Sequence, residues 1–411
     1  MKKLLFIYLS IFTVFIVSCG NKVLNPTESV DGITYYDVSN TETAKFNISV
    51  FTYDLNKPEI VKGEEFKKIA ESSHAIVYIQ NGQSVDMSNV KKFFSKFEEN
   101  YDEELRIYGE PISFPSINND KVVFLIYNFF TKTDLGGAGF SNPYDLYDNH
   151  SETLNHGKYL YIHSEYLKDP DRVAATMLHE FQHLINASVN IIKGGKAMDL
   201  WLNEALSEST SVLFAPVIYN NDRKTIFNGL SYYSFYSWYI GDIIPINGII
   251  QFSYCSSSIF MKWIEHIGGI ETIRDIAHSS PSSDTRSRLV DSVKDLKIGD
   301  NVEQIFVSWI KDIYKGNLPD IKVDVMDFSK FAGLITPGKG LPLVPGAFII
   351  YDATKYNLDN LQGLSKELLD ESKNLYLVWN PNFDSVDVDG KIDPNAVIWI
   401  QPTENYTTTI K

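Results

Sequence analysis

The stretch 178–184, Leu-His-Glu-Phe-Gln-His-Leu, constrains this chain more than any other part of its sequence. His179 and His183 are four residues apart, and on a helix this spacing places both imidazoles on one face. Two imidazoles so placed can bind one Zn²⁺ at about 2.0–2.1 Å each. Glu180 follows the first histidine and can reach a water molecule on the metal without being a ligand. The stretch therefore predicts a zinc site with a general base beside it.

This HExxH string alone is weak, because a solvated helix with two unrelated histidines would show the same letters. Its surroundings favour the metal site. The string lies within an apolar stretch of helical periodicity, 173–185. Asp169 is a candidate N-cap, Pro170 follows in the first turn, and Asp171 lies near the positive end of the helix dipole. We therefore predict a helix here that is built to present the two histidines.

The amino terminus predicts export. Lys2 and Lys3 precede an apolar run, 4–17, which is too short for a membrane span and has the shape of a signal peptide. Residues 16–19, Ile-Val-Ser-Cys, resemble a bacterial lipobox, in which Cys19 is diacylated and becomes the first mature residue. A plain secretory signal with an incidental cysteine is the alternative.

We therefore expect residues 1–18 to be a lipoprotein signal peptide and residues 19–31 a flexible tether. Acyl chains on Cys19 would hold the protein at a membrane of the bacterial cell envelope, either surface-exposed or periplasmic. Secretion in a free form is the alternative. The only other cysteine is Cys255, so lipidation of Cys19 excludes an intrachain disulfide.

The formal net charge of −15 argues against nucleic acid or anionic lipid as the main partner. We expect instead a protein or peptide substrate, a monomeric protein, and membrane attachment only through the lipid. The length of 411 residues allows two or three domains, or one large two-lobed domain.

The part of the chain before residue 169 has the pattern of a β/α lobe. Predicted strands lie at 33–38, 46–53, 75–79, 121–130 and 159–163. The segment 57–73 is polar and charged, with a candidate short helix at 66–70. Residues 86–101 have apolar residues at helical spacing and predict an amphipathic helix. The order strand, helix, strand implies a βαβ-like unit ahead of the zinc helix.

A glycine-rich run at 135–140 precedes Tyr144-Asp145-Leu146-Tyr147. It predicts either an edge strand beside the cleft or a tight turn. His156 and His163 also precede the zinc helix, and we expect them to be ordinary surface or core histidines.

The part after residue 199 is helical at first and then rich in predicted strands. Helices are expected at 199–217, 256–267 with a stop at Gly268-Gly269, 270–278, 283–296 and 302–314. Residues 220–249 are aromatic and loop-like. Strand-like runs follow at 347–351, 375–379 and 396–400.

A catalytic zinc needs a third protein ligand. The metzincin pattern would require a glycine at 186 and a histidine at 189, where this chain has Asn186 and Val189. The gluzincin pattern instead places a glutamate on a second helix, and Glu204 fits at 21 residues past His183. Glu208 lies one turn further along the same face. It could accept a hydrogen bond from the far ring nitrogen of His179.

The sequence around 179–186 together with Trp201-Leu202-Asn203-Glu204-Ala205-Leu206-Ser207-Glu208 resembles the hyicolysin family of gluzincin metallopeptidases. The resemblance covers roughly residues 75–314. More distantly, the layout of the chain is similar to that of thermolysin. One departure is Ala205, where relatives tend to have glycine. The resemblance implies an α+β, zincin-like fold with two lobes: a sheet plus the zinc helix above, a helical lobe below, and a cleft between them.

On this basis we expect an N-terminal β/α lobe at 32–168, the zinc-binding helices and helical lobe at 169–317, and a small β-rich C-terminal appendage at 318–411. The expected activity is that of a zinc-dependent endopeptidase acting on extracellular proteins, with one Zn²⁺ per chain. A surface lipoprotein that keeps the fold for binding or adhesion without turnover is the alternative. The intact Glu180 favours the peptidase.

In gluzincins a histidine or tyrosine of the lower lobe donates a hydrogen bond to the oxyanion. Tyr254 is the first choice for that donor, because it immediately precedes the predicted helix at 256–267. Tyr236 and Tyr239 are the alternatives.

Overall fold

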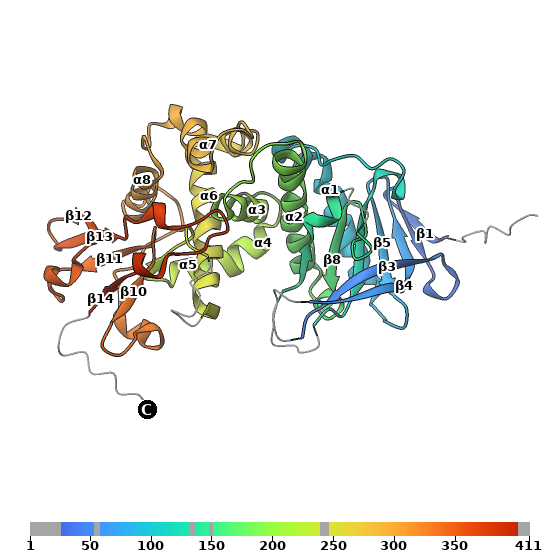
Figure 1. The fold of residues 1–411 in the computed structure, drawn as a ribbon, viewed down its shortest axis with the longest axis horizontal. Helices are drawn as coiled ribbons and strands as arrows, with labels where there is room; N and C mark the ends of the chain where they lie inside the picture. Colours follow the sequence, from blue (N-terminus) through green and yellow to red (C-terminus); the bar gives the residue numbers. More distant parts are fainter. Residues whose placement is uncertain (1–25, 53–57, 131–136, 148–150, 239–245, 402–411) are drawn as a thin grey trace, which may run out of the picture.

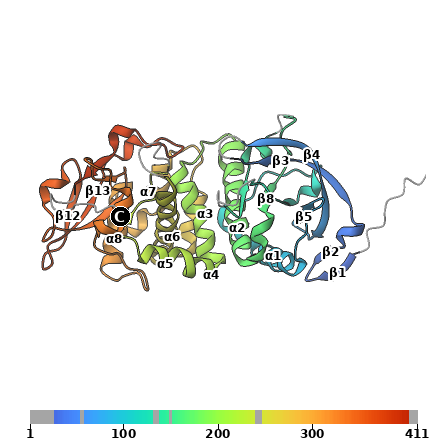
Figure 2. The same ribbon diagram turned by 90° about the horizontal axis from the view of Figure 1, so that it is seen from below.

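The computed structural model describes residues 26–401 except 53–57, 131–136, 148–150 and 239–245. An N-terminal sheet, a central group of helices and a C-terminal group of strands follow one another along the long axis (Figure 1). The same order is visible from below in Figure 2. Cys19 and its lipobox lie outside the described residues. Among the residues that are described, no helix is long and apolar enough to cross a membrane.

The N-terminal sheet has eight strands in the order β1-β2-β4-β5-β6-β8-β7, with β3 paired to β4. These are β1 (Pro26–Val30), β2 (Ile33–Tyr36), β3 (Thr43–Val50), β4 (Glu59–Glu71), β5 (Ala75–Gln80), β6 (Val122–Tyr127), β7 (Gly139–Ser141) and β8 (Tyr159–His163). Strands β5, β6 and β8 are parallel, and α1 (Met87–Tyr108) connects β5 to β6. The predicted βαβ-like unit is therefore confirmed.

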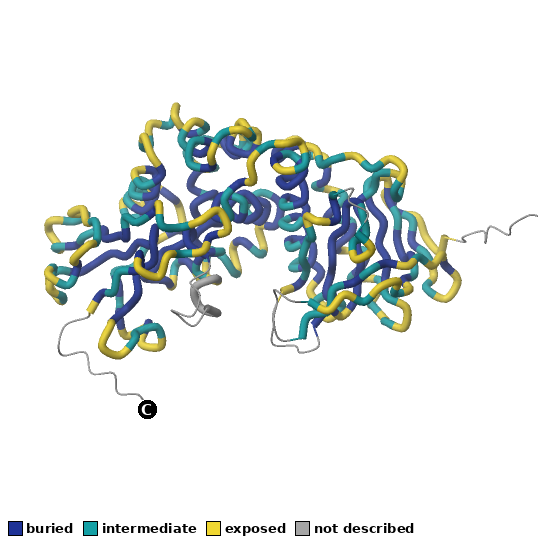
Figure 3. The backbone as a smooth tube through the Cα atoms, in the orientation of Figure 1, coloured by how far each residue is buried: buried dark blue, intermediate teal, exposed yellow. Residues whose placement is uncertain are grey.

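Two helices pack on one face of this sheet, α1 and α2 (Pro170–Ala187). Phe97 of α1 packs edge-on against Phe124 of β6 at a centroid distance of 4.8 Å and against Phe181 of α2 at 5.4 Å. The tube in Figure 3 shows that the central strands and the sheet-facing sides of these helices are buried. This apolar packing fixes the position of α2, which carries His179 and His183.

Two expectations for the N-terminal part are wrong. The segment with the candidate helix at 66–70 forms the long strand β4, because β3 pairs with one of its edges and β5 with the other. These long-range pairings override the helix propensity of its Lys and Glu residues. Part of the predicted tether, Pro26–Val30, forms the strand β1, which pairs with β2.

The central helices are α3 (Leu200–Phe214), α4 (Pro216–Ile218), α5 (Thr225–Asn228), α6 (Ile246–Ala277), α7 (Thr285–Ser292) and α8 (Val302–Tyr314). Helix α6 begins ten residues before the predicted start at residue 256. The expected stop is present as a break inside it, since Gly269 has the non-helical angles φ 76° and ψ 177°.

The C-terminal strands are β10 (Leu341–Leu343), β11 (Phe348–Asp352), β12 (Ser365–Asp370), β13 (Leu375–Trp379) and β14 (Ile398–Ile400). The expected strands at 347–351, 375–379 and 396–400 are thus confirmed. They do not form a separate appendage. Strands β10 and β14 pair with each other, whereas β11, β12 and β13 form a four-stranded sheet, β12-β13-β11-β9, that includes β9 (Tyr232–Tyr233) from the helical region. The C-terminal region and the helical region therefore share one sheet.

Candidate metal site and active-site cleft

Helix α2 begins as the sequence predicts. The side chain of Asp169 accepts a hydrogen bond from the backbone N–H of Arg172, and Pro170 occupies the first turn. One side of the helix is buried in the sheet-facing core, including Val173, Met177, Leu178, Phe181 and Ile185. His179, Glu180 and His183 lie on the opposite, partly exposed side.

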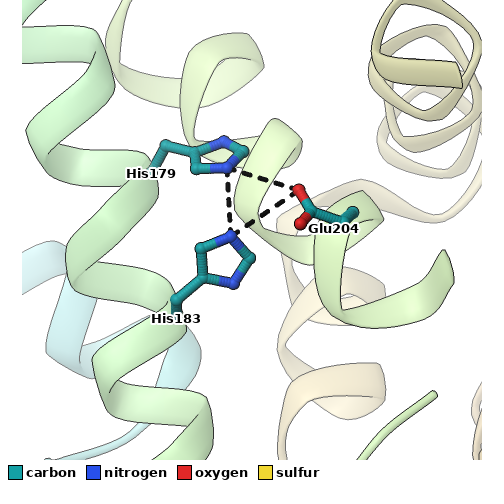
Figure 4. Close-up of side chains that lie close together, drawn as sticks. All are labelled: His179, His183 and Glu204. Atoms are coloured by element: carbon teal, nitrogen blue, oxygen red, sulfur yellow. Dashed lines mark hydrogen bonds and ion pairs between the residues drawn. The ribbon is translucent and has the colours of Figure 1, made fainter. Parts of the chain in front are cut away.

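The structure brings His179, His183 and Glu204 together (Figure 4). The Nε2 atoms of the two histidines are 3.1 Å apart. Oε2 of Glu204 lies 3.4 Å from Nε2 of His179 and 3.6 Å from Nε2 of His183. Ligand atoms that lie about 2.0–2.1 Å from zinc at a tetrahedral angle are about 3.3–3.4 Å from one another. The three side chains therefore have the spacing of a tetrahedral zinc site.

The state of Glu204 Oε2 also fits a metal ligand. This atom is buried and has no hydrogen-bond partner in the described structure. A buried carboxylate oxygen without a partner is costly unless a cation lies beside it. Zinc on the two histidines would satisfy this oxygen.

Electrostatics at the site favour a cation. Burial raises the pKa of Glu204, but the facing charges of His183 and His179 outweigh burial and lower it well below its ordinary value. Burial likewise lowers the pKa of His183, but Glu204 outweighs it and raises this pKa to about 9. Without metal, the carboxylate is thus stabilised by protonated imidazole, a role that a metal ion would take over.

The second ring nitrogen of His183 is held by α3. Nδ1 of His183 is 3.1 Å from Oδ1 of Asn203 and 3.0 Å from Oγ of Ser207. Such partners fix the orientation of a ligand imidazole. Neither residue was assigned a role from the sequence, although both lie in the motif that carries Glu204.

Glu208 lies beside His179, as predicted, but its hydrogen bonds go elsewhere. Oε1 of Glu208 is 3.5 Å from Nδ1 of His179, which is longer than a normal hydrogen bond. The carboxylate instead accepts two hydrogen bonds of 2.7 Å from Arg223. Sequence reasoning missed Arg223, because nothing in the Asp222-Arg223-Lys224 run of this aromatic, loop-like stretch points to a carboxylate partner on α3.

Glu180 contacts the free edge of the N-terminal sheet. Its Oε2 accepts hydrogen bonds from both the backbone N–H and the hydroxyl of Ser141, each at 2.9 Å. Ser141 ends β7, so of the two structures expected for the glycine-rich region, the edge strand is present at Gly139–Ser141.

Of the three candidate oxyanion donors, the structure places Tyr254 at the site. Its ring centroid is 6.1 Å from that of His179. The negative charge of Glu204, together with burial, raises the pKa of the Tyr254 hydroxyl well above its ordinary value, so this hydroxyl stays protonated and able to donate. Tyr236 is wrong as an alternative, because it is buried against Trp201 and its hydroxyl accepts a hydrogen bond from Arg286. Tyr239 lies outside the described residues.

The other two histidines near the site in sequence are not part of the cluster, as expected. His163 is buried among aromatic residues, with its ring centroid 4.8 Å from that of Phe129. Nδ1 of His156 is 2.8 Å from the carbonyl oxygen of Tyr147.

Two hollows meet at the cluster. One, of about 360 Å³, is lined partly by Arg172, Thr176 and Arg223. The other, of about 530 Å³, is lined partly by Phe140, Ile191 and Met198. His179, Glu180 and Tyr254 line both. The cleft therefore extends in two directions from the candidate metal site.

No protein family model matches the chain. The neutral metalloprotease ShpI of Staphylococcus hyicus is 27% identical over 175 residues, which cover 38% of this chain and 37% of that protease. The chain thus spans little more than a third of the length of the protease it matches. A distant relationship over part of its length connects this chain to a metalloprotease, whose activity implies a metal.

Proposed function

We propose that this protein is a zinc-dependent endopeptidase with a zincin-like, two-lobed fold. One observation carries the proposal: the side chains of His179, His183 and Glu204 lie at the spacing of zinc ligands, and Glu180 lies beside them in the cleft. The distant relationship to a metalloprotease supports the same activity.

The chain's own residues supply the proton transfers and the charge stabilisation. Zinc, when held by the three ligands, would act as a Lewis acid and lower the pKa of water to about 7. Glu180 takes a proton from the attacking water and delivers it to the leaving amine, so that one peptide bond and one water become a carboxyl and an amino end. Tyr254 donates its hydroxyl proton in a hydrogen bond to the carbonyl oxygen as negative charge develops there.

The two hollows favour cleavage within a chain rather than at its end. A peptide whose scissile bond lies at His179, Glu180 and Tyr254 has a hollow on either side for its side chains. Among the described residues, β7 is the last strand at its edge of the sheet, and its main-chain groups could bind an extended peptide that adds to the sheet as a further strand.

We also propose that lipid on Cys19 anchors the protein to the bacterial cell envelope, where it would act on extracellular proteins. The support is the lipobox-like sequence at 16–19. Cys19→Ser should shift the protein from the detergent phase to the aqueous phase in a phase-partitioning assay, and equal partitioning of the two would favour a plain secretory signal.

The proposed activity is tested with zinc-loaded protein and a general substrate such as casein. Hydrolysis should stop when a chelator removes the metal and return when zinc is added. Glu180→Gln should keep its zinc and lose activity by about 10²–10⁴-fold, because it removes the general base but no ligand. Full activity of Glu180→Gln, or of chelator-treated protein, would refute the proposal. Retained peptide binding without hydrolysis by the wild type would favour the adhesion alternative.

A further inference from the structure

Ser141 makes two contacts with the proposed general base. Its backbone N–H and its hydroxyl both donate to the same oxygen, Oε2 of Glu180, at 2.9 Å each. Ser141 belongs to the edge strand β7 and Glu180 to helix α2, so these bonds join the sheet to the catalytic helix. The second carboxylate oxygen, Oε1, takes no part in them.

Other contacts hold β7 in place without Glu180. A Cβ at Gly139 would meet the side chain of Met177 on α2 and lie 2.6 Å from the carbonyl oxygen of Tyr161 on β8. Only glycine therefore allows the strand this close to both elements. The ring of Phe140 stacks on that of Tyr161, with centroids 4.5 Å apart and planes at 12°. Ser141 is thus presented to Glu180 by a strand whose position is already fixed.

We propose that Ser141 is a positioning residue for the peptidase reaction, an inference that rests on the proposed function. Its hydroxyl holds Oε2 of Glu180 so that Oε1 is the oxygen that takes the proton from water and returns it to the amine. A free glutamate side chain visits several rotamers, whereas a general base must lie within about 2.6–3.2 Å of the proton it removes. Holding one oxygen keeps the other at its working position.

The hydroxyl and the backbone N–H have different parts in this arrangement. The N–H of Ser141 lies on the free edge of the sheet, where an extended peptide would add. A bound peptide can take up this N–H, and the hydroxyl then remains as the group that holds Glu180. Removal of the hydroxyl should therefore affect turnover more than peptide binding.

Ser141→Ala tests this directly in zinc-loaded protein. We expect kcat to fall about tenfold, the lower end for loss of one hydrogen bond to a charged group, with KM and zinc content close to wild type. Ser141→Thr keeps the hydroxyl and should restore most of kcat. Ser308→Ala is the matched control. It removes a partly buried hydroxyl on α8 that donates to the carbonyl oxygen of Ile298 away from the cleft, and it should leave kcat unchanged.

The Glu180→Gln background separates positioning from general damage. If Ser141 acts through Glu180, adding Ser141→Ala to the Glu180→Gln variant should not lower kcat further. The Glu180→Gln variant and the double variant should bind a fluorescent peptide with the same Kd. An undiminished kcat in Ser141→Ala, or a further tenfold loss in the double variant, would overturn the inference while leaving the peptidase intact. A zinc-loaded wild type that hydrolyses nothing would overturn the proposed function, and the role of Ser141 with it.

Discussion

The backbone N–H of Leu200 donates a 2.8 Å hydrogen bond to the carbonyl oxygen of Val388. Leu200 is the first residue of α3, the helix that carries Glu204, and Val388 lies almost 190 residues further along the chain. The N-cap Asp199 makes no capping bond to the helix and instead accepts a hydrogen bond from Thr285. The start of the helix that carries Glu204 is therefore held by distant segments of the chain.

We predict that the purified protein holds about one zinc per chain, as expected for one three-ligand site. His183→Ala should lose this zinc, because it removes one ligand and leaves Oε2 of Glu204 without a cation. Elemental analysis after gel filtration measures the ratio. His266→Ala, which alters an exposed histidine on α6, should retain the metal. Equal zinc in both variants would place the metal elsewhere.

Tyr254→Phe should lower kcat by about 10²–10³-fold, the usual effect of losing one oxyanion donor. KM and zinc content should change little, because the hydroxyl acts mainly in the transition state. Steady-state kinetics on a peptide substrate measure the effect. Tyr236→Phe is the control, since that hydroxyl bonds Arg286 away from the cleft. Near wild-type kcat in Tyr254→Phe would exclude it as donor, and Tyr239→Phe would then be the variant to measure.

Glu208→Gln should weaken zinc binding, by at most the roughly 10–100-fold that loss of a hydrogen-bonded partner of a metal-binding histidine costs. The change removes the charge beside His179 and leaves Arg223 facing a neutral amide. Competition with a fluorescent chelator measures the affinity. Glu265→Gln removes a glutamate paired with Lys262 away from the site, and its zinc affinity should match the wild type. Unchanged affinity in Glu208→Gln would show that this carboxylate does not support the metal.

Glu104 should make stability depend on pH. It is fully buried on α1, neither carboxylate oxygen has a hydrogen-bond partner in the described structure, and burial raises its pKa well above the ordinary 4.5. The folded protein therefore keeps a proton that the unfolded chain releases above pH 4.5. As a result, the contribution of Glu104 to the unfolding free energy falls by about 1.4 kcal/mol for each pH unit between pH 4.5 and the pKa of Glu104 in the folded protein.

Glu104→Gln cannot ionise, so its melting temperature relative to wild type should rise as pH increases from 4 to 7. The comparison is made in the inactive Glu180→Gln background with chelator present, so that neither self-digestion nor metal loss at acid pH contributes. A difference in melting temperature that stays constant over this range would contradict the prediction.

Local patterns in the sequence were sufficient to predict much of the site. The cap at Asp169 and the apolar periodicity gave helix α2, and its four-residue histidine spacing predicted a shared ligand position. Glu204 could be proposed because it lies in a second helix at a suitable distance from His183. The signals for these features lie within single helices or, for Glu204, in the motif spacing of a known type of metal site.

The missed features depend on tertiary contacts that no local pattern specifies. Arg223 bonds Glu208 and Ser141 bonds Glu180, and neither has a local signal that names its partner. The segment that forms β4 differs from the helix expected at 66–70 for the same reason, since its conformation depends on pairing with β3 and β5. The pairing of Tyr233 with Phe348, which joins β9 to β11, could not be read from either segment alone.

The pairing of β9 with β11 limits where this chain can be divided when segments are exchanged between genes. A gene fusion that cut after residue 317 would separate β9 from β11, the strand it pairs with, and would remove the carbonyl of Val388 from the start of α3. The part of the chain after residue 317 should therefore stay with the helices that carry His179, His183 and Glu204 whenever segments are exchanged between related proteins.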